Sequence, residues 1–355
     1  MITRIEIDGF KSFDEFVLDL RPFNVLVGSN NSGKSNLLEA VELLGRLLRG
    51  QDRALVEHDR GTGSQLFRRR VDGEAVPEFE IHAGMTRVSQ LGEREEGSAS
   101  VRVRSTSEGL RIQDRRLSES TAFGNEIRRA FVLTPLAGRM RSGAALEDRS
   151  ALEPDGSNLA AVLGRIQQAG LMPDLEMAAG FIIEDLREIR PVPYSQLARW
   201  ELELGLGARG RFPAALVSDG TLRILALLAA VYDPGGSGVI LIDELENGLH
   251  PAYQRRLVEV LRRQANGHRD LPTPQIIATT HSPVVLAAVL DGNPDDAIFL
   301  SQAVGRSARE GVLGGPRTHT RARRIADSGE PGTYISRWEV QRYLDSTRPE
   351  SVVQT

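Results

Sequence analysis

The chain has 355 residues, of which 40% are hydrophobic and 26% charged, and its formal net charge is -4. This length can bury a large core, in one big domain or two lobes, while the mildly negative balance excludes a polycation built to coat nucleic acid, although a local basic face stays open. The absence of cysteine excludes disulfides and thiolate metal sites. Because we find neither a signal-peptide pattern nor an apolar run long enough to span a bilayer, we expect a cytoplasmic protein without a membrane segment.

The N-terminal region predicts a strand–loop–helix unit. Alternating polar and apolar residues indicate strands at 2–7 and 16–20, and the apolar run FNVLV at 23–27 indicates a buried strand. Leucines at helical spacing predict a helix over 35–49. The segment GSNNSGKS, residues 28–35, therefore lies between a buried strand and a helix.

Further along, expected strands and helices follow one another. Residues 61–112 alternate polar and apolar between glycine-rich turns, which is typical of antiparallel strands, whereas residues 158–187 are expected to be helical. The other expected strands are 131–134, 200–206, 239–242 and 275–279, and the other expected helices are 222–231, 253–264, 283–290 and 336–344. Beyond Asp296, the apolar AIFLSQ is followed by a stretch rich in glycine and arginine.

The segment GSNNSGKS fits the phosphate-cradling pattern G-x-x-x-x-G-K-[ST] in its required context. In such a loop successive backbone amides bind phosphate oxygens, and the following helix N-terminus adds a positive potential. Lys34 is then expected to reach the β- and γ-phosphates of ATP, and the Ser35 hydroxyl to bind Mg²⁺. The alternative is a plain turn, which this context disfavours. The expected nucleotide contacts are Gly28, Asn30, Asn31, Ser32, Gly33, Lys34, Ser35 and Asn36.

The positions of the lysines also favour a phosphate-binding loop. Lys11 and Lys34 are the only lysines, and arginine takes the other places in the combined total of lysine and arginine. A GC-rich genome explains the general bias towards arginine. Lys34 nevertheless stands inside the loop, where the thin stem and compact charge of a lysine fit a phosphate-wrapping backbone better than a planar guanidinium does.

The segment GVILIDELENGLHP supplies the acidic residues that a phosphate-cleaving enzyme needs next. Its apolar strand ends directly in two carboxylates, Asp243 and Glu244. Asp243 is expected to hold the Mg²⁺ shell, and Glu244 to orient and deprotonate the attacking water. A solvated loop is a poor explanation for two adjacent carboxylates after a buried strand.

Two further segments offer additional residues for a nucleotide-binding site. LVSDGTLRILALLAAV places Ser218, Asp219 and Gly220 at the start of a long apolar helix, as either an anion site or an ordinary N-cap. IIATTHSP places His281 directly after a strand, as either a γ-phosphate sensor or an ordinary strand-end residue. The order and spacing of all four motifs favour a nucleotide site.

As a set, these stretches resemble the ABC-type ATPase heads of the RecF/SMC/OLD group, and more closely the short AAA-family ATPases of bacterial repair and phage-defence loci. The resemblance includes IEIDGFKSF and PDGSNLAAVL and extends from residue 2 to about residue 290. It implies an α/β fold, a P-loop NTPase with an ABC-type head, a mixed or antiparallel β sheet and an inserted helical lobe. The implied parts are an ATPase lobe at 1–135, the helical lobe at 136–205, the signature, Walker B and histidine switch at 206–300, and a C-terminal extension at 301–355.

The resemblance also implies a mechanism. Two heads pair head to tail as a homodimer with ATP between them, and hydrolysis releases the pair. Lys34 and Ser35 of one subunit then face Ser218 and Gly220 of the other, because the helix N-terminus needs an anion that the partner's nucleotide brings.

Some features depart from the family pattern. The signature is SDGT rather than the transporter-like SGGQ, and no adenine-stacking aromatic or membrane-docking feature supports a transport ATPase. No clear glutamine loop exists, and Gln65 is a weak candidate for one. Arg139 and Arg141 are either phosphate or partner contacts or ordinary surface residues.

Two functions from different classes stay open. One is a DNA-linked ATPase of repair or phage defence that binds duplex DNA through arginines at 66–70 and 318–324, unless these are solvated arginine faces. The other is a scaffold or sensor ATPase that controls a separate effector such as a nuclease. Glu310 follows no apolar strand and no Asp-x-Asp comes after it, as a Toprim nuclease would need, so we expect no nuclease in this chain. The lack of a long heptad run argues against an SMC-like tether.

Overall fold

The protein folds into two compact units. In this computed structural model, unit 1 comprises Met1–Ala130 and Ile277–Thr355, and unit 2 comprises Phe131–Ile276, so that the boundary falls inside strand β13 (Gln275–Thr280). The lobe boundaries implied by the family resemblance stay a prediction. The structure describes residues 1–53, 55, 65–69, 73–88, 93–107, 109–118, 126–208, 210–267, 273–305, 317–325 and 334–346.

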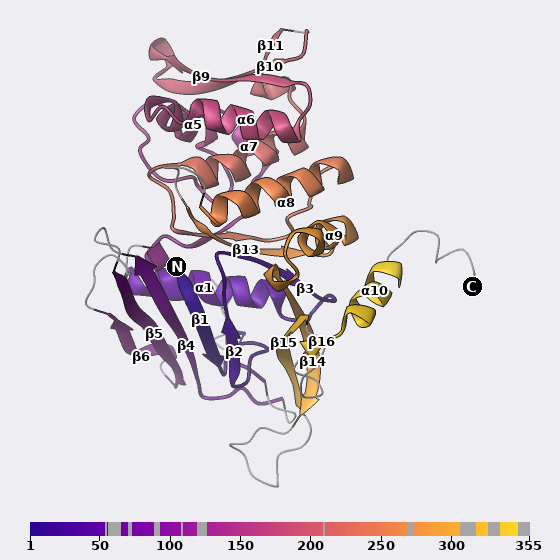
Figure 1. The fold of residues 1–355 in the computed structure, drawn as a ribbon. Helices are drawn as coiled ribbons and strands as arrows, with labels where there is room; N and C mark the ends of the chain where they lie inside the picture. The colour runs from indigo at the N-terminus through magenta and orange to yellow at the C-terminus, as the bar shows by residue number, and fades with distance from the viewer. Residues whose placement is uncertain are drawn as a thin grey trace. The chain divides into compact units, whose positions relative to one another are not determined.

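The first sheet of unit 1 confirms the antiparallel strands expected from the alternating pattern. Its order is β2-β1-β4-β5-β6 and all of its pairs are antiparallel. Ile5 and Ile7 are buried while Glu6 and Asp8, which follow them, are half-buried, because successive side chains of a strand point to opposite faces. Helix α1 (Lys34–Leu48) packs against β5, as Figure 1 also shows. The strands are β1 (Ile2–Asp8), β2 (Phe16–Asp19), β4 (Glu78–Val88), β5 (Arg94–Thr106) and β6 (Gly109–Leu117).

The second sheet of unit 1 positions the GSNNSGKS loop. Strand β3 (Phe23–Val27) lies between β13 and β14 (Ala297–Gly305) and is buried along its whole length. Strand β15 (Arg317–Ile325) pairs antiparallel with β14, and the short β16 (Tyr334–Ile335) follows at the edge. The remaining elements of this unit are α9 (Pro283–Gly292), η3 (Pro294–Asp296) and α10 (Arg337–Ser346).

Strand β15 is a feature that the glycine- and arginine-rich pattern did not predict. Its partner, β14, pairs with it over residues 299–305, so the strand depends on contacts with a separate segment rather than on apolar periodicity. Thr320 is buried and its neighbour Arg321 is exposed, because successive side chains of a strand point to opposite faces.

Unit 2 is built around helix α7 (Asp219–Tyr232), in which every residue from Thr221 to Tyr232 is buried. The helix contacts α4 (Ala137–Met140), α5, α6 and α8. Among the described residues, no helix is both long and apolar enough to cross a membrane. The other elements are β7 (Phe131–Leu133), β8 (Ala144–Ala145), α5 (Leu159–Gln168), α6 (Met172–Ile182), β9 (Leu186–Tyr194), η1 (Ser195–Leu197), β10 (Arg199–Leu206), β11 (Arg211–Pro213), η2 (Ala214–Leu216), β12 (Val239–Ile242) and α8 (Pro251–Ala265).

The helix predicted to reach residue 187 ends earlier. Helix α6 stops at Ile182 and strand β9 begins at Leu186, because β9 pairs with β10 along its whole length and this pairing overrides local helix propensity. Pro191 and Pro193 occupy alternate positions of β9. Within the part of the chain that the structure describes, β9 pairs with β10 alone, so it lies at an edge of the sheet, where a missing amide hydrogen is tolerated.

Candidate nucleotide-binding site

The loop at residues 28–33 is shaped by close packing against the C-terminal strands of unit 1. A Cβ on Gly28 would lie 2.2 Å from the carbonyl oxygen of Leu300, and one on Gly33 would lie 2.4 Å from Oγ1 of Thr320. Gly33 also has a φ of 100°, and Asn31 has a φ of 66°. Glycine is required at these two points because any side chain would collide with the neighbouring strands.

The interior of the loop presents donors that fit a phosphate group. Lys34 is 5% exposed, and its Nζ donates to the carbonyl oxygens of Gly28 at 2.8 Å and Ser29 at 2.9 Å. The Ser32 hydroxyl is buried and has no hydrogen-bond partner within the described chain. Gly33 provides no capping side chain to α1, whose first turn holds no acidic residue. A buried ammonium, an unpaired hydroxyl and an uncapped helix N-terminus together suit an anion.

Three residues that the motif did not reveal support this loop. The Thr320 hydroxyl donates to the carbonyl oxygen of Ser32 at 3.1 Å and lies 2.8 Å from Oγ of Ser12. Gln302 Nε2 donates to the carbonyl oxygen of Asn31 at 2.9 Å. The side chain of Asn36, an expected nucleotide contact, donates to Ser12 Oγ at 3.0 Å, while Asn30, Asn31 and Ser35 are exposed.

His281 also belongs to unit 1. Strand β13 is buried throughout and is the sheet neighbour of β3, and His281 follows it directly. The turn at His281 is held by the Ser282 amide, which donates to Thr280 Oγ1 at 3.0 Å, while Ser282 Oγ caps α9. The structure therefore places the GSNNSGKS loop and His281 after adjacent strands of one sheet.

The two expected acidic residues follow β12 in unit 2. Asp243 is half-buried and Glu244 is exposed. Glu244 has a φ of 51°, and its carbonyl oxygen accepts the Asn247 amide at 3.0 Å and Arg223 Nη2 at 2.8 Å. Left-handed backbone is rare for a residue with a side chain and persists where the surroundings impose it.

Ser218 is the N-cap of α7, which is one of the two roles that the sequence predicted for it. Its Oγ accepts the Thr221 amide at 3.2 Å. Arg141 holds the residues on either side, because its Nη2 donates to the carbonyl oxygen of Val217 at 2.7 Å and to Asp219 Oδ1 at 2.6 Å. Arg141 is far from Val217 and Asp219 in the sequence, so the sequence alone could not predict these contacts.

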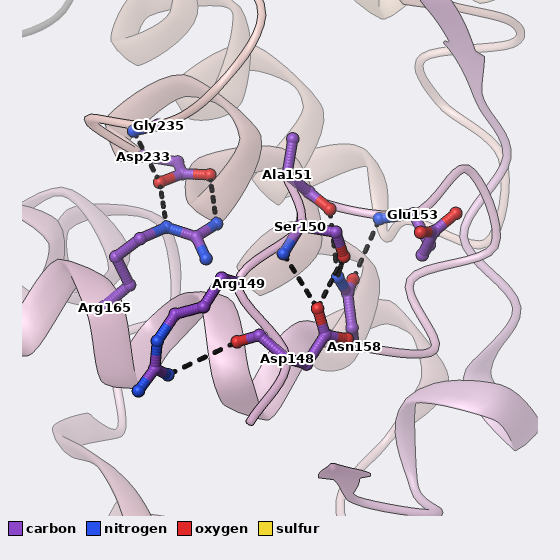
Figure 2. Close-up of polar contacts among 9 residues, drawn as sticks. All are labelled: Asp148, Arg149, Ser150, Ala151, Glu153, Asn158, Arg165, Asp233 and Gly235. Atoms are coloured by element: carbon purple, nitrogen blue, oxygen red, sulfur yellow. Dashed lines mark hydrogen bonds and ion pairs between the residues drawn. The ribbon is translucent and has the colours of Figure 1, made fainter. Parts of the chain in front are cut away.

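Figure 2 shows how the other end of α7 is fastened to α5. Arg165 binds Asp233 with two contacts, Nε to Oδ1 at 2.8 Å and Nη2 to Oδ2 at 2.6 Å, and the Asp233 side chain is fully buried. The hydrogen bond with Asp233 raises the pKa of Arg165. Asn158, from the segment PDGSNLAAVL, accepts the Glu153 amide at 2.8 Å and donates to the Ala151 carbonyl oxygen at 2.9 Å.

The proposed basic patch at 66–70 is buried in part. Leu66 and Phe67 are buried, and Arg68 is 6% exposed and pairs with Asp14 at 2.9 Å between Nη2 and Oδ1. The buried bridge of Phe67 with Phe10 draws this segment into the core. Arg69 and Gln65 are exposed, and Arg70 and Glu310 lie outside the described residues.

The second patch, at 318–324, is partly turned inwards. Arg324 donates to the backbone carbonyl oxygens of Asp295 and Asp19, and burial lowers its pKa. Arg321 is exposed. Arg139, the other arginine left open by the sequence, is exposed and lies 3.4 Å from Asp155.

The chain matches known proteins in sequence and in fold. The family model described as "AAA domain, putative AbiEii toxin, Type IV TA system" matches residues 23–287, well over half of the chain. A segment of 76 residues is 40% identical to the retron Vc95 probable ATPase of Vibrio cholerae serotype O1 biovar El Tor, covering 21% of this chain and 14% of that protein. Another of 44 residues is 50% identical to the DNA replication and repair protein RecF of Bifidobacterium adolescentis, covering 12% of this chain and 11% of RecF.

The fold is similar to that of an SMC head. The structure of the SmcHead bound to the C-winged helix domain of ScpA aligns with a TM-score of 0.59 and 16% identity, covering 90% of this chain and 98% of that one. The α/β architecture is accordingly that of a P-loop NTPase with an ABC-type head. The chain therefore belongs to the matched AAA-domain family, and it resembles RecF in a short segment of sequence and the SMC heads in fold.

Proposed function

We propose that the protein is a Mg-ATP-dependent ATPase that dimerises head to tail on binding ATP and couples hydrolysis to DNA-related work in repair or phage defence. The observation that carries the proposal is the loop at 28–33, in which a buried ammonium and an unpaired buried hydroxyl lie beside an uncapped helix N-terminus. Similarity to RecF and to a retron ATPase supports the link to repair and defence.

The chain's own groups divide the work as follows. Bound Mg-ATP supplies the phosphoanhydride bond and the metal charge that offsets charge on the transferred phosphoryl group. Lys34 would exchange the carbonyl oxygens of Gly28 and Ser29 for phosphate oxygens, and Ser35 and Asp243 would offer oxygen ligands to Mg²⁺. The exposed Glu244 carboxylate accepts the proton of the attacking water, and His281 senses the γ-phosphate.

The surface around the start of α7 supports pairing with a second copy. Leu216 is 73% exposed, the most among the large hydrophobic side chains that the structure describes, and it stands two residues before Ser218. An apolar side chain beside a helix N-terminus suits a partner that brings both an apolar surface and a bound anion. Gel filtration of the Glu244→Gln variant tests this, because trapped ATP should hold the dimer; a variant that stays monomeric in saturating Mg-ATP contradicts the proposal.

A second candidate is a scaffold or sensor ATPase that controls a separate effector such as a nuclease. Met177 and Phe181 lie one turn apart on α6 and are 62% and 47% exposed, which suits a protein partner. The SMC head of the solved structure is itself bound to a winged-helix domain. The burial of Arg68 also removes part of the surface expected to bind DNA.

The ATP hydrolysis rate with and without duplex DNA, at two salt concentrations, separates the two candidates. Strong stimulation that falls as salt rises supports DNA-linked work, because phosphate contacts release counterions. Slow turnover that is indifferent to DNA contradicts that role and favours the effector-controlling ATPase. Substituting the exposed Arg321 by Gln should weaken stimulation, whereas the buried Arg68 is unsuitable as a probe because its loss would unpair Asp14.

A further inference from the structure

Helix α7 touches the turn after β12 at two points one helical turn apart. A Cβ added to Gly220 would lie 2.8 Å from the carbonyl oxygen of Gly248, so the helix backbone approaches this turn closely. Three residues later, Arg223 Nη2 donates to the carbonyl oxygens of Glu244 at 2.8 Å and Asp243 at 3.3 Å. Positions three apart share one face of a helix, so one face of α7 carries the whole contact.

Arg223 occupies an unfavourable place for an arginine. It is 8% exposed, and desolvation lowers its pKa despite the nearby carboxylates of Glu244, Glu246 and Asp243. Its Nε is buried without a hydrogen-bond partner in the described chain. Burying a guanidinium is costly unless its contacts compensate. The contacts it makes are to the main chain of the two acidic residues.

Those contacts fix the backbone that carries the Glu244 side chain. The carbonyl oxygen of Glu244 accepts both Arg223 and the Asn247 amide, which together set the plane of the peptide bond after Glu244. The φ of 51° at Glu244 costs free energy and needs such support. A substitution of Arg223 would therefore release the main chain of Glu244 without removing its carboxylate.

We propose that Arg223 is a positioning residue of the ATPase: it holds the main chain of Glu244 in its left-handed conformation and ties it to the helix that begins at Ser218. This inference rests on the proposed function, in which Glu244 is the base. In the head-to-tail dimer, the helix whose start meets the partner's nucleotide then also sets the base for the subunit's own nucleotide. Arg223 links the two sites through one rigid helix.

Arg223→Met, which keeps length and apolar volume but removes the donors, tests the proposal. The turnover number for ATP should fall by about tenfold to a hundredfold, as expected when a catalytic group is displaced by about 1 Å. The Kd for ATP should stay within about twofold, and Arg223→Lys should recover part of the rate, because an ammonium can still donate to one carbonyl oxygen. Arg256→Met is the matched control, since Arg256 also contacts main-chain carbonyl oxygens, of Phe181 and Ile182, and its loss should leave turnover unchanged.

Repeating the substitution in a Glu244→Gln background separates positioning from general damage. Arg223→Met should add no further loss of residual hydrolysis there, because the base it positions is already gone. The same fold loss in both backgrounds overturns the proposal, as does an unchanged turnover number in the wild-type background. If Arg223→Met does not fold, Arg223→Lys undergoes the same comparison. Failure of the proposed function is distinct: Glu244→Gln itself then leaves hydrolysis unchanged.

Discussion

The two units hold their nucleotide motifs in different ways. In unit 1, the loop at 28–33 is fixed by short side chains: the Thr320 hydroxyl donates to the carbonyl oxygen of Ser32 and also contacts the Ser12 hydroxyl. In unit 2, the start of α7 and the turn after β12 are held by the long side chains of Arg141 and Arg223. Because it is fixed by close packing, the loop at 28–33 has its shape before nucleotide binds. The turn after β12 is tied to α7, so its position depends on the position of that helix. We therefore expect unit 1 to set nucleotide affinity and unit 2 to set the rate of hydrolysis.

The largest effect on folding should come from Arg165→Met, which removes the counter-ion of the fully buried Asp233 side chain and leaves it only the Gly235 amide as a described hydrogen-bond donor. The free energy of unfolding should fall by about 3–5 kcal/mol, the usual cost of an uncompensated buried charge, as measured by urea denaturation. Arg149→Met is the control, because Arg149 makes contacts of 3.4 and 3.5 Å to the carbonyl oxygens of Leu146 and Asp148. Equal losses in the two variants would show that the buried pair does not anchor α7.

Lys34→Ala tests the role of unit 1 in binding. The Kd for ATP should rise by about a hundredfold, because a charge-assisted bond to phosphate contributes about 1.5–3 kcal/mol and the buried cradle loses its cation. Isothermal calorimetry measures this directly. Lys11→Ala is the matched control from the other lysine, which pairs with Glu39. An ATP affinity that is the same for both variants contradicts the assignment of the cradle.

Thr320→Val should have the smallest effect and sharpens the comparison most. Removing the hydroxyl deletes the bond to the Ser32 carbonyl oxygen at nearly constant volume. The Kd for ATP should rise about three- to tenfold, in line with about 1 kcal/mol for a neutral hydrogen bond, while the turnover number stays unchanged. Thr318→Val, at an exposed position of the same strand, should alter neither quantity. A fall in turnover without a change in affinity would break the division between the units.

Much of the fold could be predicted because its signals are local. The strands at 2–7, 23–27 and 239–242, and the helix that follows GSNNSGKS, appear where their apolar periodicity places them. The motif residues stand at the ends of these elements, since a strand–loop–helix unit fixes the position of Lys34 and a strand end fixes that of Asp243.

The remainder depends on contacts between distant parts of the chain. Nothing in the sequence around Thr320 or Arg223 indicates that one supports the phosphate loop and the other the Glu244 backbone, because their partners lie 288 and 21 residues away. The prediction that the helix extends to residue 187 was wrong for the same reason, because residues 186–194 pair with β10 and form a strand. The local sequence around Arg68 is typical of a surface segment, and its burial depends on the ion pair with the distant Asp14.

We propose Glu244 as the base of an ATPase whose phosphate-binding loop is already formed without nucleotide. The most direct test compares single-turnover ATP hydrolysis by the wild-type protein and by Glu244→Gln, together with their ATP affinities. We expect equal affinities and a rate lower by about a thousandfold in the variant, within the usual contribution of general-base catalysis. Equal hydrolysis rates in the two proteins would contradict it.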